Sequence, residues 1–99
     1  MPHTTHATHV TRLTRHAQRD LLTVPRPDAL RILHGLAEFQ KALAAGDTTH
    51  FDTRALHGHP SRRRLALGDH RAVYTLEDGR LVVWALADAR RHRGAHRAP

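Results

Sequence analysis

Arginine is the residue whose number and distribution in this sequence point most directly to chemistry. Of 16 basic side chains, 15 are arginine and only Lys41 is lysine. A guanidinium stays charged at physiological pH and presents a planar fork that matches phosphate oxygens in a bidentate way. Residues 50–99 hold ten basic and five acidic side chains, against six and four in residues 1–49. This basic half indicates a polyanion or an acidic protein as partner, although abundant Ala, Arg and His are also typical of GC-rich coding.

Histidine is the second residue type that could do chemistry, because imidazole titrates near neutral pH and 11 histidines are present. His3, His6 and His9 are spaced by three, as metal ligands on one helix face can be. Nothing in this stretch favours a helix and no carboxylate lies near, so residues 1–8 are expected to form a flexible polar tail. The chain has no cysteine, which excludes a disulfide scaffold, a thiolate metal site and a cysteine nucleophile.

Length and hydropathy restrict the class of protein further. A chain of 99 residues, of which 39% are hydrophobic, fits one domain with one core, here expected over residues 9–96. No apolar run approaches the roughly 18 residues that a membrane span needs. Residues 1–9 also lack the apolar stretch of a secretory signal. The sequence therefore predicts a cytoplasmic protein that has no membrane partner.

The N-terminal half predicts one short strand and two helices. Residues 9–13 alternate as a strand does, and Thr14 is a suitable N-cap for a helix over about residues 15–23. Two prolines end that helix. The second of them suits the first turn of another helix over about residues 27–45, for which Gly46 is a suitable C′ residue.

The C-terminal half changes to a period of two, which is typical of strands. Strands are expected over residues 64–67, 71–76 and 81–86, after a long polar connection over residues 47–62. Asp78-Gly79 is the strongest short-range hairpin signal. The predicted order is β-α-α-β-β-β, an α+β fold with a helical hairpin packed on one face of a small antiparallel sheet. The other face of the sheet is left for solvent or for a ligand.

The segment from residue 56 to residue 74 resembles the core signature of the RelE/ParE toxin superfamily. In that family a Leu-x-Gly precedes a basic strand, a Gly-Asp turn, a Tyr/His-Arg pair and a short apolar run ending in tyrosine. The matching residues are Leu56-x-Gly58 and Arg64-Leu65-Ala66-Leu67-Gly68-Asp69-His70-Arg71-Ala72-Val73-Tyr74. The hairpin, the apolar strand and the basic element after it also match, so the likeness covers roughly residues 9–96.

The resemblance implies the toxin of a type II toxin–antitoxin pair. Its partner would be a cognate antitoxin, expected to be acidic and encoded by a neighbouring gene. RelE-like members cleave mRNA on the ribosome without metal, through attack of a 2′-OH on the adjacent phosphate, and this branch is favoured here. ParE-like members bind DNA gyrase on the same scaffold, so a gyrase-binding toxin, or a degenerate member that acts by binding only, is the alternative. No cofactor and no metal site are expected.

Carried over residue by residue, the resemblance assigns the candidate site. Arg71 matches the arginine that contacts the scissile phosphate. Arg64 matches the first basic position of the preceding strand, and Arg90 the arginine after the last strand. Ala66 departs from the pattern, because the family has a second basic residue there. Further basic side chains expected to bind the substrate are Arg62, Arg63, Arg91 and Arg93.

Acid and base work suits histidine better than arginine, whose pKa is too high. The family often places a tyrosine or histidine after the last strand. No tyrosine stands there in this sequence, so His92 and His96 are the candidates for the catalytic proton donor. Some relatives use a carboxylate before the Leu-x-Gly as the base, and Asp52 or His50 lies near that place.

Each candidate also has a purely structural interpretation. The run Arg62–Arg64 is typical of a solvated strand edge, and Arg71 could pair with Asp69 or Asp88. Tyr74 is expected in the core. Trp84 could stack on RNA, although a tryptophan in an apolar strand more often lies in the core.

Overall fold

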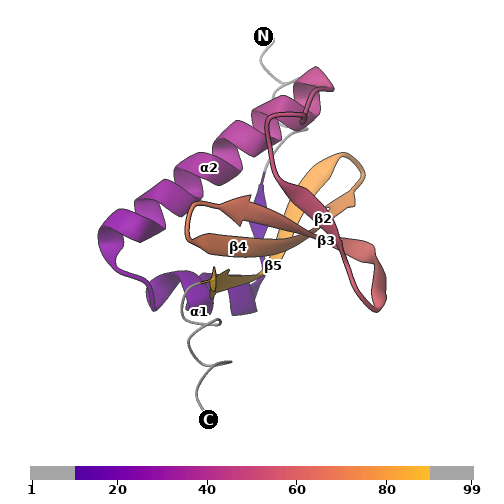
Figure 1. Ribbon diagram of the computed structural model, residues 1–99. Coiled ribbons are helices and arrows are strands. Elements are labelled where there is room, and N and C mark those ends of the chain that lie inside the picture. Colours follow the sequence, from indigo (N-terminus) through magenta and orange to yellow (C-terminus); the bar gives the residue numbers. More distant parts are fainter. Residues whose placement is uncertain (1–10, 90–99) are drawn as a thin grey trace, which may run out of the picture.

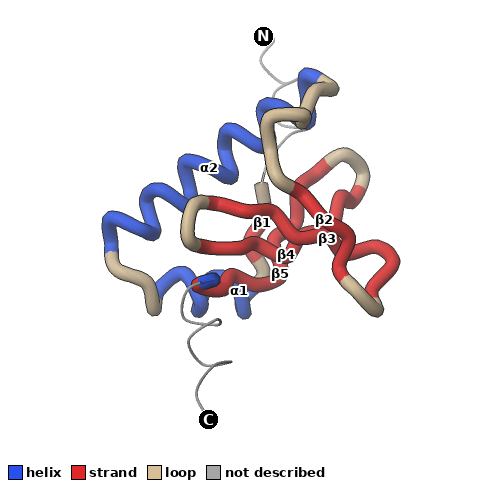
Figure 2. Tube along the Cα trace, in the orientation of Figure 1, coloured by secondary structure: helices blue, strands red, loops and turns tan. Residues whose placement is uncertain are grey.

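The structure is a computed structural model that describes residues 11–89 of the chain. It contains two helices and five strands (Figures 1 and 2). Their bounds are β1 (Arg12–Leu13), α1 (Arg15–Leu22), α2 (Arg26–Ala45), β2 (Thr53–Leu56), β3 (His59–Leu67), β4 (His70–Glu77) and β5 (Arg80–Asp88). The strands form one sheet in the order β1-β5-β4-β3-β2. The predicted α+β class and the helical hairpin on the sheet are confirmed.

One strand was not expected from the sequence. β2 lies within residues 47–62, which were interpreted as a polar connection, and β3 begins earlier than expected, at His59. β2 is an edge strand that pairs with β3 alone, and its residues are exposed or only half-buried. A strand with no buried face shows no alternation of polar and apolar residues, so its pattern gave no signal.

The sheet is mixed rather than antiparallel. β1 runs parallel to β5, with Arg12 paired to Val82 and Leu13 to Val83, whereas every other neighbouring pair is antiparallel. Strands that pair in parallel are joined by a long crossover connection, so they are distant in the sequence. The two residues of β1 are too few to form a pattern that would predict β5 as the neighbouring strand. The pairing is therefore a property of the assembled sheet and not of the local sequence.

Aromatic and aliphatic side chains fix α2 against the sheet. Ile32, Leu36 and Phe39 of α2 are each no more than 2% exposed. The Phe39 ring meets Tyr74 of β4 edge-to-face at 5.3 Å and Phe51 at 5.1 Å, between ring centres. Such pairs contribute about 0.5–1.5 kcal/mol each beyond their burial. Tyr74 is thus a core residue, as expected, and faces the helices.

The turns and caps predicted from the sequence are present. Gly46 has a φ of 78° and ends α2 in the left-handed conformation. Asp78 and Gly79 both have positive φ, 54° and 77°, as a two-residue type I′ hairpin between β4 and β5 requires. Within residues 11–89, no helix is long and apolar enough to cross a membrane. The cytoplasmic location stays a prediction.

A bulge interrupts the pairing of β4 with β5. Val73 pairs with Ala85, but the next residue, Tyr74, pairs with Val83. Trp84 is therefore an extra residue in β5. A bulge of this kind redirects side chains and leaves backbone groups without ladder partners.

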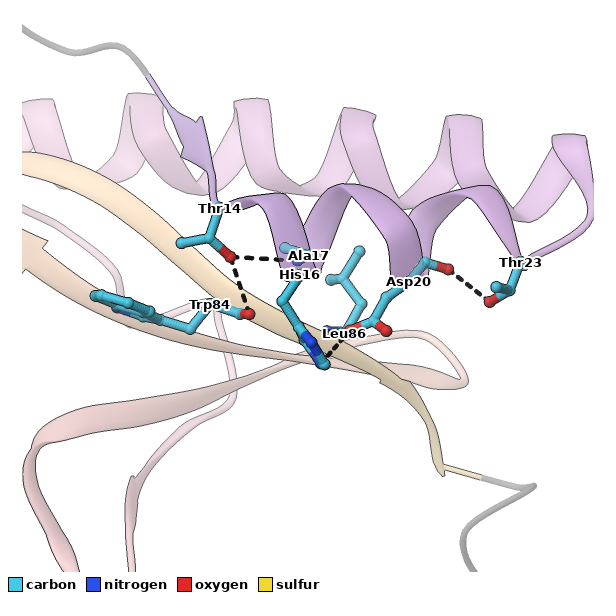
Figure 3. Close-up of polar contacts among 7 residues, drawn as sticks. All are labelled: Thr14, His16, Ala17, Asp20, Thr23, Trp84 and Leu86. Atoms are coloured by element: carbon cyan, nitrogen blue, oxygen red, sulfur yellow. Dashed lines mark hydrogen bonds and ion pairs between the residues drawn. The ribbon is translucent and has the colours of Figure 1, made fainter.

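Two side chains of the α1 segment satisfy the backbone around this bulge (Figure 3). Thr14, the N-cap of α1 as predicted, accepts a hydrogen bond from Ala17 N and donates one to the carbonyl oxygen of Trp84 at 3.1 Å. Asp20 Oδ2 accepts a hydrogen bond from Leu86 N at 2.9 Å. β1 is too short to form hydrogen bonds with these groups, so side chains of the α1 segment form them along the edge of β5.

Replacement of Asp20 by alanine should lower the free energy of unfolding by about 1–3 kcal/mol, because the half-buried Leu86 N–H loses its acceptor. Urea denaturation measures this. Glu38→Ala is the control, since among the described residues Glu38 pairs with Lys41 on the exposed side of α2 and its loss should change stability by about 0.5 kcal/mol or less. Equal effects of the two substitutions would contradict the role of Asp20.

Candidate functional site: an arginine-lined pocket

Alternation along β3 and β4 sends arginine side chains to the sheet face that the helices leave uncovered, here called the open face. Leu65 is fully buried in the core, so its neighbours Arg64 and Ala66 face the other way. The register pairs Arg64 with Val73 and Ala66 with Arg71. Directly paired residues lie on the same face. Arg64 and Arg71 therefore lie on the open face of adjacent strands.

A pocket of about 280 Å³ lies between these arginines. Three of its lining residues carry guanidinium groups, one carries a carboxylate, and the rest are mostly small. They are Asp52, Arg54, Arg64, Ala66, Gly68, His70, Arg71 and Ala89. Positive groups around a space with small walls make a site suited to a phosphate-sized anion.

Arg54 is the site residue that the sequence analysis missed. β2 places it directly opposite Arg64, and hence on the open face. It adds a third guanidinium to the pocket, where the neighbouring position on the open face of β3 is Ala66. Its Nε lies 3.6 Å from Asp52 Oδ1, but both side chains are more than 60% exposed, so this ion pair holds them only weakly. Only recognition of β2 as a strand could have revealed Arg54.

The pocket gathers three guanidinium groups and the carboxylate of Asp52. Within residues 11–89, one ion pair in the pocket joins Arg54 to Asp52. The alternative that Arg71 pairs with Asp69 or Asp88 stays a prediction. Like charges opposite one another on neighbouring strands destabilise a sheet, and Arg54 faces Arg64 in this way. An anion that binds between them would relieve this repulsion.

Arg62 and Arg63 lie on opposite faces of β3. Arg63 shares the face of Leu65, and its Nη2 donates a hydrogen bond to Thr53 Oγ1 at 3.1 Å. The guanidinium carbon of Arg62 lies 4.7 Å from the ring centre of Trp84. Consecutive strand residues alternate, so the position of Arg63 does not support the substrate-binding role expected of it.

The remaining candidates fall beyond or beside the pocket. Arg90, Arg91, His92, Arg93 and His96 lie outside the described residues, and their roles stay predictions. Ala89, the last described residue, lines the pocket, whereas His50 does not.

The titratable groups of the described chain include no ready metal centre. Within residues 11–89, no three histidine or carboxylate side chains gather closely enough to hold a metal ion.

Hydrogen bonds from the side chain and backbone of Thr49 lower the pKa of Asp47, which is fully exposed after α2 and does not line the pocket. His70 lines the pocket and is 5% exposed.

Comparison with known proteins identifies the fold. No protein-family model and no curated protein matches the sequence. The archaeal RelE–RelB complex from Pyrococcus horikoshii matches with a TM-score of 0.64 and 20% identity, over 83% of this chain and 96% of that one. The RelB–RelE antitoxin–toxin complex from Methanococcus jannaschii matches with a TM-score of 0.64 and 15% identity, and the match covers 88% of this chain and 99% of that one. The isolated E. coli RelE toxin matches with a TM-score of 0.60 and 15% identity, and the match covers 90% of this chain and 97% of that one. The chain therefore has the RelE-like toxin fold, which confirms the resemblance at the level of the fold.

Replacement of Arg64 by glutamine should raise the free energy of unfolding by about 0.2–1 kcal/mol at low salt, because it removes the repulsion with Arg54. The gain should shrink at high salt as the charges are screened. Urea denaturation at two ionic strengths measures both effects. Arg63→Gln is the matched control and should give no gain, since it costs a hydrogen bond to Thr53. A loss above about 1 kcal/mol for Arg64→Gln would show that Arg64 is a structural residue.

Proposed function

We propose that this protein is the toxin of a type II toxin–antitoxin pair and cleaves mRNA on the ribosome without a metal ion. The observation that carries the proposal is the pocket, in which Arg54, Arg64 and Arg71 converge on the open face of a RelE-like fold. Guanidinium groups supply there the fixed positive charge that phosphate chemistry needs.

The proposed reaction is an intramolecular attack within the RNA. The 2′-oxygen forms a bond to the adjacent phosphorus while the bond from phosphorus to the 5′-oxygen breaks. The products are a 2′,3′-cyclic phosphate and a 5′-hydroxyl, and no water is consumed. Negative charge builds up on the non-bridging oxygens as the reaction proceeds, and preorganised donors stabilise it. Arg64 and Arg71, on adjacent strands, can contact these oxygens from two sides.

Two proton transfers accompany this attack. Asp52 is the carboxylate of the pocket and is the proposed acceptor for the 2′-OH proton; Arg54 Nε lies 3.6 Å from its Oδ1. The departing 5′-oxygen needs a donor that is protonated near neutral pH, which suits a histidine. His92 and His96 follow the pocket residue Ala89 in the sequence and are the proposed donors.

Replacement of Arg71 by alanine should abolish toxicity and leave the fold intact. Loss of one preorganised charge at a transition state typically lowers the rate by about 10²–10³, whereas a half-exposed strand residue outside the core contributes little to stability. Growth after induction and the incorporation of labelled amino acids measure the effect.

Arg63→Ala is the matched control for this experiment, because it removes the same charge from the other face of the sheet. It should remain toxic at equal expression. If Arg71→Ala remains toxic too, the phosphate-contact role is wrong. Arrest of DNA replication before translation would favour the gyrase-binding alternative, which nothing in the structure or the comparisons supports.

Cleavage of ribosome-bound mRNA should survive a chelator of transition metals and should depend on pH near neutrality. Activity should survive the chelator because arginines provide the positive charge. It should depend on pH because a histidine would donate the proton. Single His92→Ala and His96→Ala variants, assayed across pH, identify the donor. Full activity of both variants would remove the histidine assignment, and loss of activity with intact ribosomes in the chelator would overturn the metal-free mechanism.

The proposed partner is an acidic cognate antitoxin, and two of the compared structures are RelE–RelB complexes. The chain carries a net charge of +7. On α2, Leu30 is 56% and Leu33 39% exposed, which offers apolar contact on the helical side of the molecule. The association rate should fall as salt rises, because screening shortens electrostatic steering to about 10 Å at 0.1 M. Stopped-flow mixing measures this, and a rate indifferent to salt would count against an acidic partner.

A further inference from the structure

We propose that Trp84, together with Arg62, forms a stacking platform for a nucleobase of the RNA beside the cleaved phosphate. This inference rests on the proposed function, because it takes single-stranded RNA as the ligand. It assigns a second binding element to the open face. This element contacts a base, whereas the arginine-lined pocket binds a phosphate.

The bulge in β5 turns Trp84 toward the open face. Trp84 is the inserted residue, and its Nε1 donates a hydrogen bond to Thr75 Oγ1 at 2.8 Å. Thr75 follows the core residue Tyr74 in β4, so its side chain lies on the face away from the helices. The indole is therefore on the same side of the sheet as Arg64 and Arg71, and it remains half-buried rather than enclosed.

Polar contacts hold the indole in a fixed orientation. Thr75 Oγ1, which accepts the indole N–H, donates in turn to Glu77 Oε2 at 3.1 Å. The Arg62 guanidinium carbon lies 4.7 Å from the indole ring centre. A ring fixed at its edge and next to a cation is preorganised, so little rotamer entropy remains to be lost when a base stacks. Both indole and guanidinium planes are surfaces on which RNA bases stack.

A second hollow adjoins the arginine-lined pocket and extends to Ala85, the residue after Trp84 in β5. This hollow of about 180 Å³ shares three residues with the pocket, Arg64, Arg71 and Ala89. Its other lining residues are Val73, Ala85, Leu86 and Ala87.

The distances between these residues suit neighbouring nucleotides. Ala85, which lines the second hollow, directly follows Trp84 in β5. Arg62 and Arg64 are separated by one pleat of β3, which is about 7 Å along the strand. A nucleotide whose phosphate lies between Arg64 and Arg71 can therefore place an adjoining base against Trp84.

Intrinsic fluorescence tests this directly, because Trp84 is the only tryptophan of the chain. The full chain is titrated at low salt with a short single-stranded RNA whose 2′-O-methyl groups prevent cleavage. Polyphosphate, which has the charge but no bases, is titrated in parallel. Polarisation of a labelled copy of the RNA reports binding independently. We expect the RNA to quench Trp84, and polyphosphate to displace the RNA without quenching.

Variants separate stacking from charge. Trp84→Leu should weaken RNA binding about 5- to 100-fold, as loss of one stacked base does, and change polyphosphate binding by about twofold or less. Trp84→Phe should keep most of the affinity. Arg62→Gln should weaken RNA binding more than its matched control Arg63→Gln, which lies on the other face.

The outcomes distinguish this inference from the proposed function. If RNA binds without quenching Trp84, or if polyphosphate quenches it equally, the platform is wrong and an RNA substrate is still supported. If the RNA does not bind at all, the platform and the proposed RNA substrate fail together. The wild-type titration decides these points even if a Trp84 variant does not fold.

Discussion

The pleat of β3 and β4 is the constraint on which the site depends. Leu65 and Ala72 are fully buried beneath α2, so the residues beside them in the chain, Arg64 and Arg71, must face outward. A slip of one residue in this register would place arginine in the core and leucine in water, which burial of one face strongly forbids. The hydrophobic core thus positions the charged groups without touching them.

The bulge in β5 is the second device that shapes the open face. It adds Trp84 to the strand and so places an aromatic ring among basic side chains. On its other edge β5 pairs with β1 only as far as Leu13. Beyond that point Thr14 and Asp20 of the α1 segment form hydrogen bonds with Trp84 O and Leu86 N, which tie the helix to the strand that carries the ring.

Local signals in the sequence predicted the parts of the fold that local chemistry determines. Thr14 as N-cap, Gly46 at the end of α2 and the Asp78-Gly79 turn all occupy the predicted positions. β2 and the parallel pairing of β1 were not predictable, because an exposed edge strand has no period and a two-residue strand shows no partner. Arg54 was missed for the same reason, since it reaches the pocket only through β2.

The central claim of this account is that arginines on the open face promote attack by a 2′-OH on RNA. The most direct test is the chemistry of the new mRNA ends that form after the protein is induced in cells. Attack by a 2′-OH predicts fragments with a 2′,3′-cyclic phosphate on one side of the break and a 5′-hydroxyl on the other. Fragments with 5′-phosphate ends, or growth arrest without any new mRNA ends, would contradict it.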